Sequence, residues 1–138
     1  MILLDTSGIL SALYPDQRRH REAAAILSES TAPRILSPLI LAEVDYFIAR
    51  GGGPVSELRF LAQITAGVYE LASFDGQDVD DASKIIASYH DLNIGLADAS
   101  LVILAKRYNC WDILTLDERH FRAVRFGRRP FRILPADA

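Results

Sequence analysis

Short apolar runs alternate with helix-like segments along the chain, and this alternation limits the folds that the chain can adopt. The first run, MILL, is apolar at every position, as expected for a strand covered on both faces. The runs typical of strands cover residues 1–4, 33–38, 69–74, 112–117 and 131–134. Alternating strands and helices are typical of a parallel sheet between two layers of helices. The sequence therefore predicts an α/β fold: a three-layer α/β/α sandwich with a mainly parallel central sheet.

The helix-like segments lie between these runs and carry ordinary start and stop signals, such as Gly51–Gly53 after the third helix. The predicted helices cover residues 7–14, 18–30, 39–50, 55–66, 75–93, 95–109 and, as a helical turn, 118–124. The connections are short, and a length of 138 residues suits one domain. We therefore expect residues 1–138 to form a single domain.

Composition argues against several protein classes. The longest apolar stretches, such as LVILA at 101–105, are too short to cross a bilayer, and the start shows no signal-peptide pattern. Cys110 is the single cysteine, so an internal disulfide is impossible, and one unpaired thiol suits a reducing compartment. We expect a cytoplasmic protein with no membrane association.

The net charge of −3 conceals an uneven distribution. Residues 119–138 carry six arginines and one acid, hence +5, whereas residues 1–118 carry nine bases and seventeen acids, hence −8. A basic end on an acidic body suits contact with a polyanion, but a solvated surface explains the charge equally well.

Two acids stand at the carboxyl ends of predicted strands, where open α/β sheets form their sites. These are Asp5 and Asp117. An aspartate there is just as commonly a turn or helix-start residue. Thr115 and the Thr6–Ser7 pair add hydroxyls that could orient an acid, although Ser7 is more readily explained as an ordinary turn hydroxyl.

Two further acids are predicted to lie on apolar helix faces. On a helix, Glu43 shares its face with Tyr46 and Phe47, and Asp98 shares its face with Leu101. An ionised carboxylate on such a face needs a partner. For Asp98 the alternative is a helix cap, and for Glu43 it is a buried salt bridge.

The fold could bring these four acids, which are distant in sequence, to one edge of the sheet. Four carboxylates would repel one another, and a divalent cation is the usual remedy. Ligation through oxygen alone fits Mg²⁺ or Mn²⁺, whereas the three histidines and the single cysteine show no ligand spacing for zinc. A cation held by carboxylates suits phosphate chemistry.

Four motifs together resemble those of PIN-domain nucleases, and most closely the VapC toxins of bacterial toxin–antitoxin modules. They are LLDTSGIL, SPLILAEV, GLADASLVILAKRY and ILTLDERHF, and they span nearly the whole chain in the right order. The resemblance implies an α/β/α sandwich with the activity of a metal-dependent ribonuclease. By motif, Asp5, Glu43 and Asp98 match the three core acids, Asp117 matches the fourth, and Thr115 matches the hydroxyl two residues before it.

The resemblance also implies an endoribonuclease that cleaves a structured tRNA or ribosomal RNA loop and so inhibits translation. It implies a homodimer that a VapB-like antitoxin inhibits. In the hypothesised mechanism, Mg²⁺ or Mn²⁺ held by the acids activates a water for attack on the scissile phosphorus. RNA phosphates would contact Arg119, Arg122 and Arg125, with Arg18 and Arg19 in a second patch.

Two other interpretations stay open. Receiver domains and phosphatases of the haloacid dehalogenase type also hold Mg²⁺ at strand ends, but they need a further acid beside the first strand, and this chain has DTS there. A catalytically inactive PIN-like module that binds RNA or protein would keep its acids for structural reasons. Cleavage of RNA distinguishes the enzyme from both.

Overall fold

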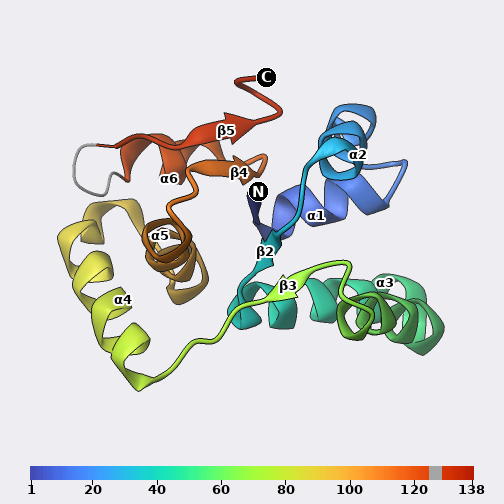
Figure 1. Ribbon diagram of the computed structural model, residues 1–138, viewed down its shortest axis with the longest axis horizontal. Coiled ribbons are helices and arrows are strands. Elements are labelled where there is room, and N and C mark those ends of the chain that lie inside the picture. The colour runs from blue at the N-terminus through green and yellow to red at the C-terminus, as the bar shows by residue number, and fades with distance from the viewer. Residues whose placement is uncertain (125–128) are drawn as a thin grey trace.

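A five-stranded parallel sheet forms the centre of the protein in the computed structural model, which describes residues 1–124 and 129–138 (Figure 1). The strands of the described residues are β1 (Ile2–Leu4), β2 (Arg34–Leu36), β3 (Glu70–Leu71), β4 (Asp112–Leu114) and β5 (Arg132–Leu134). Their order in the sheet is β3-β2-β1-β4-β5, and every neighbouring pair is parallel. The predicted parallel sheet is therefore confirmed, although each strand is shorter than the apolar run that predicted it.

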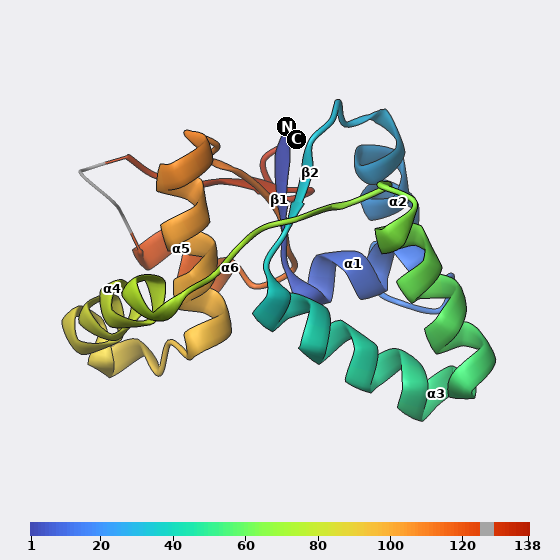
Figure 2. The ribbon, with the colours of Figure 1, turned by 60° about the horizontal axis from the view of Figure 1, so that its bottom comes forward.

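Helices cover both faces of the sheet, as Figures 1 and 2 show together. One face carries α1 (Thr6–Leu13), α2 (His20–Glu29) and α3 (Pro38–Thr65), and the other carries α4 (Gly76–Ser88), α5 (Leu96–Tyr108) and α6 (Glu118–Ala123). A short 3₁₀ turn, η1 (His90–Leu92), precedes α5. Right-handed crossovers explain the division, because the chain steps along the sheet in one direction from β1 through β2 to β3 and in the opposite direction from β3 through β4 to β5. The predicted sandwich is confirmed.

Helix α3 contains the interruption that the glycines predicted. Gly53 has φ 73° and ψ −174°, which is outside the helical region, and Pro54 follows it. The two predicted helices, 39–50 and 55–66, correspond to the two halves of α3. The first half begins at Pro38, and Ser37 caps it by accepting a hydrogen bond from the Leu39 N–H at 3.2 Å.

The core lies on both faces of the short strands. Leu3, Ile35, Ile113 and Ile133 are all fully buried, which explains why the strand sequences are continuously apolar. Burial of each such side chain contributes roughly 1.5–3 kcal/mol. Within the described residues, no helix combines the length and the apolar character needed to cross a bilayer.

The order of the strands places a switch point between β1 and β4. From β1 the chain crosses to β2 on one side, and β4 lies on the other. Ligands of open α/β sheets bind outside the carboxyl ends of the strands at such a point. Leu4 pairs with Leu114 across the two strands, so the residues that follow β1 and β4 lie side by side.

Candidate active site

Asp5 is the first side chain at this switch point. It directly follows β1, its N–H donates to the Leu114 carbonyl at 3.1 Å, and the residue is 6% exposed. Although Asp5 is the N-cap residue of α1, its side chain makes no capping hydrogen bond. The carboxylate therefore does not act as the helix cap that the sequence left open.

Two hydroxyls orient the Asp5 carboxylate. The Thr115 hydroxyl donates to Asp5 Oδ2 at 2.6 Å, and the Ser7 hydroxyl donates to the same oxygen at 3.3 Å. The Leu116 N–H donates to Ser7 Oγ at 2.9 Å, and the Asp117 N–H donates to Thr115 Oγ1 at 2.9 Å. The expectation that Ser7 is an ordinary turn hydroxyl is wrong, because Ser7 links Asp5 to the loop after β4.

A second group of side chains forms where α5 meets the start of α6. His120 Nδ1 lies 3.0 Å from Asp98 Oδ2 and 3.1 Å from Asp117 Oδ2. Asp117 also caps α6, because its Oδ1 accepts from the His120 N–H at 3.2 Å. Helix α5 has Gly95 as its N-cap residue, so Asp98 is not the cap that the sequence allowed. The three side chains offer ligand atoms that all lie within 4.8 Å of one another.

His120 is the site residue that the sequence analysis missed. The histidines and the single cysteine show no regular ligand spacing among themselves. The signal was the spacing of His120 from an acid: Asp117 and His120 are three residues apart at a helix start, which places them on one side of the first turn.

Glu43 reaches the site by way of Thr6. The Thr6 hydroxyl donates to Glu43 Oε1 at 2.6 Å, and the charge of Glu43 is one cause of the raised pKa of Asp98. The predicted burial of Glu43 is wrong: the residue is exposed, and its neighbours Tyr46 and Phe47 are 55% and 50% exposed. Within the described residues Glu43 makes no ion pair, so the alternative of a buried salt bridge is excluded there.

The electrostatics follow from burial and from like charges. Desolvation raises the pKa of Asp5 to about 6, the charges of Asp98 and Asp117 add to the rise, and the Thr115 hydrogen bond opposes it. Desolvation also raises the pKa of Asp98, and His120 opposes that rise. Burial and neighbouring acids therefore disfavour the ionised forms of Asp5 and Asp98.

This donor set fits a divalent cation. Asp98 and Asp117 supply carboxylate oxygens in one place, and His120 adds an imidazole nitrogen. Asp5 and Glu43 are not part of this group, but both lie close enough to interact with it electrostatically. Oxygen donors suit Mg²⁺ and Mn²⁺. A cation bound there would relieve the repulsion between the acids, polarise a phosphoryl oxygen and lower the pKa of bound water.

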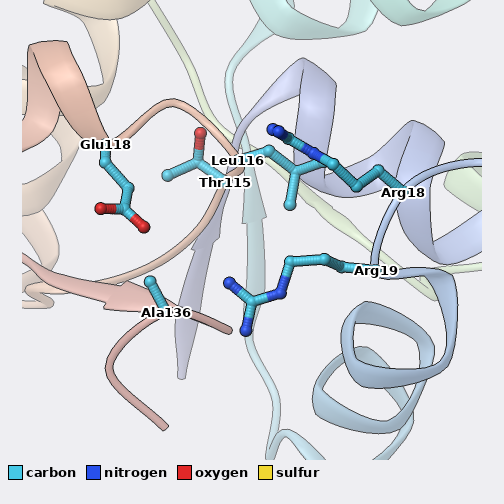
Figure 3. Close-up of a pocket in the computed structure, with 6 residues that line it drawn as sticks. All are labelled: Arg18, Arg19, Thr115, Leu116, Glu118 and Ala136. Atoms are coloured by element: carbon cyan, nitrogen blue, oxygen red, sulfur yellow. The ribbon is translucent and has the colours of Figure 1, made fainter.

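The arginines predicted to contact RNA lie in different surroundings. Arg18 and Arg19 line a small cavity whose wall includes Thr115 (Figure 3). Arg119 is exposed, and Arg122 is engaged by Asp137 at 2.7 Å. Arg125 lies outside the described residues.

The chain belongs to the PIN-domain family, whose model matches residues 2–127. It is similar to Ribonuclease VapC26 of Mycobacterium tuberculosis, with 36% identity over 135 residues that cover 97% of this chain and 100% of that protein. The resemblance to VapC proteins is therefore confirmed. Membership of this family leaves the receiver-domain and dehalogenase-type interpretations without support.

Two solved structures share the fold. The Mycobacterium tuberculosis VapC20 structure, described as a sarcin–ricin loop cleaving toxin, superposes with a TM-score of 0.81 at 16% identity and covers 94% of this chain and 100% of that one. FitAcB from Neisseria gonorrhoeae superposes with a TM-score of 0.58 at 23% identity, with 82% and 85% covered.

Proposed function

We propose that this protein is a Mg²⁺- or Mn²⁺-dependent endoribonuclease and the toxin of a VapBC-type toxin–antitoxin module. The observation that carries the proposal is the grouping of Asp98, Asp117 and His120, whose ligand atoms lie within 4.8 Å of one another, next to the carboxyl ends of β1 and β4. Asp5 and Glu43 lie outside this group but interact with it electrostatically. The relationship to Ribonuclease VapC26 supports cleavage of RNA as the reaction.

The side chains of the site have different roles. Thr115 and Ser7 hold Asp5 in one orientation, and the Thr115 hydroxyl favours the ionised form of Asp5. His120 holds Asp98 and Asp117 next to each other. A divalent cation on these acids would supply the positive charge that phosphodiester cleavage needs in the transition state.

The test is cleavage of RNA by the purified protein. We expect Mg²⁺ or Mn²⁺ to support cleavage, a chelator to stop it, and Asp98→Asn to lower the rate by at least about 100-fold, because it removes one charged donor from the site. A melting temperature within a few degrees of wild type would show that Asp98→Asn is folded. Cleavage at the wild-type rate by this variant would refute the assignment, and a wild-type protein that cuts no RNA would favour a binding module.

The RNA we propose as substrate is a structured loop in tRNA or ribosomal RNA, whose cleavage would inhibit translation. VapC20, which shares the fold, is described as cleaving the sarcin–ricin loop, and unpaired loop bases offer the edges that proteins read in RNA. Mapping the new 5′ ends in total RNA after brief expression would identify the loop. Cuts spread evenly over single-stranded RNA would count against a specific target.

We further propose a cytoplasmic protein that forms a homodimer and binds a VapB-like antitoxin. The exposed aromatic pair Tyr46 and Phe47 supports association through α3, since large apolar side chains grouped on a surface commonly mark an interface. Light scattering would give about twice the 15.3 kDa of one chain. Phe47→Asp should shift this mass to that of a monomer. An unchanged mass would exclude this face of α3 as the dimer interface.

A further inference from the structure

A small cavity with two arginines lies next to the acidic site. Its volume is about 130 Å³, below the roughly 300 Å³ at which pockets for drug-sized ligands begin. The residues that line it are Arg18, Arg19, Thr115, Leu116, Glu118 and Ala136. In Figure 3 both arginine side chains reach from the loop between α1 and α2 toward the loop after β4.

The loop that carries the arginines is held in place by hydrogen bonds. The buried Ser11 hydroxyl donates to the Arg18 carbonyl at 2.6 Å, and His20 Nδ1 lies 2.8 Å from the Ser11 carbonyl oxygen. Arg19 has φ 59°, a left-handed conformation that costs free energy for a residue with a Cβ. These contacts hold the backbone of the loop and therefore fix the Cα positions of Arg18 and Arg19.

The two guanidinium groups differ in their partners. Arg19 donates to both carboxylate oxygens of Glu22, at 3.1 and 2.6 Å. Arg18 makes no side-chain hydrogen bond or ion pair with any residue in 1–124 or 129–138. An unoccupied guanidinium offers a planar set of donors that matches the oxygens of a phosphate.

The cavity and the acidic site share a wall. Thr115 lines the cavity, and its hydroxyl donates to Asp5 Oδ2 at 2.6 Å. Thr115 would therefore lie between an anion bound in the cavity and the carboxylate of Asp5. Leu116 and Ala136 add apolar surface to the cavity.

We propose that the Arg18–Arg19 cavity binds a backbone phosphate of the RNA next to the phosphate that is cleaved, and thereby fixes the register of the strand in the acidic site. The proposal rests on the proposed function, because it assumes that RNA is the substrate. An acidic site repels RNA, so affinity has to come from a basic group beside it. Phosphate contacts of this kind set position and carry no sequence information themselves.

Glu118 is the acid in this cavity, and it makes the proposal more specific. With two arginines and one carboxylate the cavity carries a formal charge of +1. Arg122 contacts Glu118 at 3.4 Å and partly offsets its charge. Glu118→Gln removes the negative charge and keeps the shape, so it should tighten RNA binding, whereas a cavity that does not meet RNA would show no change.

The test is RNA binding in the Asp98→Asn background, in which the bond stays intact. The probe is a pool of RNA hairpins with a randomised loop, and affinity is measured over a range of salt concentrations. We expect the double variant Arg18→Ala, Arg19→Ala to bind more weakly, with a salt dependence lower by about 0.7 in log–log slope, the value for one phosphate on a single strand. Arg21→Ala is the control for the loss of one positive charge from the same segment. Arg21 does not line the cavity, so this variant should leave the slope unchanged.

A second arm tests the position of the phosphate. In a hairpin that the active protein cleaves, one neutral methylphosphonate placed next to the scissile bond should slow wild-type cleavage about 10-fold. The same substitution should have no further effect on the arginine double variant, because the contact is already absent. If the double alanine variant has a lower melting temperature than wild type, the double variant Arg18→Gln, Arg19→Gln replaces it.

The possible results test the cavity proposal independently of the nuclease assignment. If wild type cleaves RNA and the double variant binds and cleaves equally well, the cavity proposal is overturned and the nuclease assignment stands. If wild type cleaves nothing but the salt slope falls as expected, the nuclease assignment fails and the phosphate site stands. Loss of binding to a protein partner, with RNA binding unchanged, would overturn the cavity proposal.

Discussion

Asp5 couples the protonation of the site to the stability of the protein. Desolvation by burial raises its pKa from 3.8 to about 6 in the folded state. A group whose pKa rises on folding adds stability below its unfolded pKa and loses that contribution as the pH rises through its folded pKa. The chelated, metal-free protein should therefore lose up to about 3 kcal/mol of unfolding free energy from Asp5 between pH 4 and pH 7.

Chemical denaturation of the chelated protein at several pH values between 4 and 7.5 would measure this loss. Asp5→Asn provides the control, because an amide cannot titrate and should flatten that part of the pH dependence. A wild-type profile that rises steeply with pH over the same range, and that Asp5→Asn leaves unchanged, would contradict the prediction.

His120 is predicted to matter for metal affinity and not for folding. Its Nδ1 lies 3.0 Å from Asp98 and 3.1 Å from Asp117, so it acts either as a ligand or as the group that orients two ligands. Loss of such a group typically costs 10–100-fold in metal affinity or activity. We expect His120→Ala to raise the Mn²⁺ concentration for half-maximal cleavage by about that factor.

A titration of cleavage rate against Mn²⁺ would check the effect of His120→Ala. His90→Ala is the control, because His90 is exposed, pairs with Asp91 and is not part of the group formed by Asp98, Asp117 and His120. Equal Mn²⁺ requirements for His120→Ala and wild type would exclude His120 from the site.

Single residues also show how far the sequence could be interpreted. The position of Asp5 at the end of β1 was predictable from the apolar run, whereas that run left open whether Asp5 is a turn residue or part of a site. The exposure of Glu43 was not predictable, because helical periodicity says which residues share a face but not whether another element covers that face. The role of His120 was not predictable, because local patterns do not show that the start of α6 lies next to Asp98 in the fold.

At the scale of elements, the approach of α1 to β4 determines the position of Asp5. A Cβ at Gly8 would lie 2.1 Å from the Leu114 carbonyl oxygen and 2.5 Å from its carbon. Backbone atoms of a central strand cannot move aside cheaply, so Gly8→Ala should push α1 away from the sheet. We expect a loss of at least about 1–3 kcal/mol in unfolding free energy and a larger proportional loss of activity.

Thermal or denaturant unfolding of Gly8→Ala would measure this cost. Gly76→Ala is the matched control, since a Cβ at that helix position meets nothing within 4 Å. If Gly8→Ala were as stable and active as Gly76→Ala, α1 would not be packed directly on β4.

The elements themselves followed from local patterns. The alternation of apolar runs and helical periodicity predicted every strand, and the glycines predicted the break in α3. Strand β2 came out shorter because a residue at its predicted end already belongs to a helix start: Ser37 is the N-cap residue of α3. Sequence alone does not show where a strand gives way to a cap, since both conformations are extended.

At the scale of the whole molecule, the strand order is what brings distant acids together. Asp5 and Asp117 follow β1 and β4, which are neighbours in the sheet although more than a hundred residues separate them. Strand ends could be predicted from apolar runs, but the order β3-β2-β1-β4-β5 depends on crossovers that local patterns do not encode. The motif resemblance supplied that information instead.

This convergence predicts that a divalent cation stabilises the folded protein at neutral pH. The acids repel one another when ionised, and the unfolded chain does not bring them together, so the cation should bind the folded state selectively. At a concentration 100 times the dissociation constant, such binding adds about 2.7 kcal/mol, or roughly 10 °C in melting temperature for a chain of this size. The gain should shrink toward pH 5, where protons compete with the cation for Asp5. The melting temperature should therefore rise with pH when the cation is bound, whereas it should fall with pH in the chelated protein.

Thermal melts with Mn²⁺ or chelator at pH 5 and pH 7.5 would measure both effects, and Asp98→Asn should abolish most of the gain. A rise in melting temperature that is equal in Asp98→Asn and wild type would mean that the cation binds elsewhere.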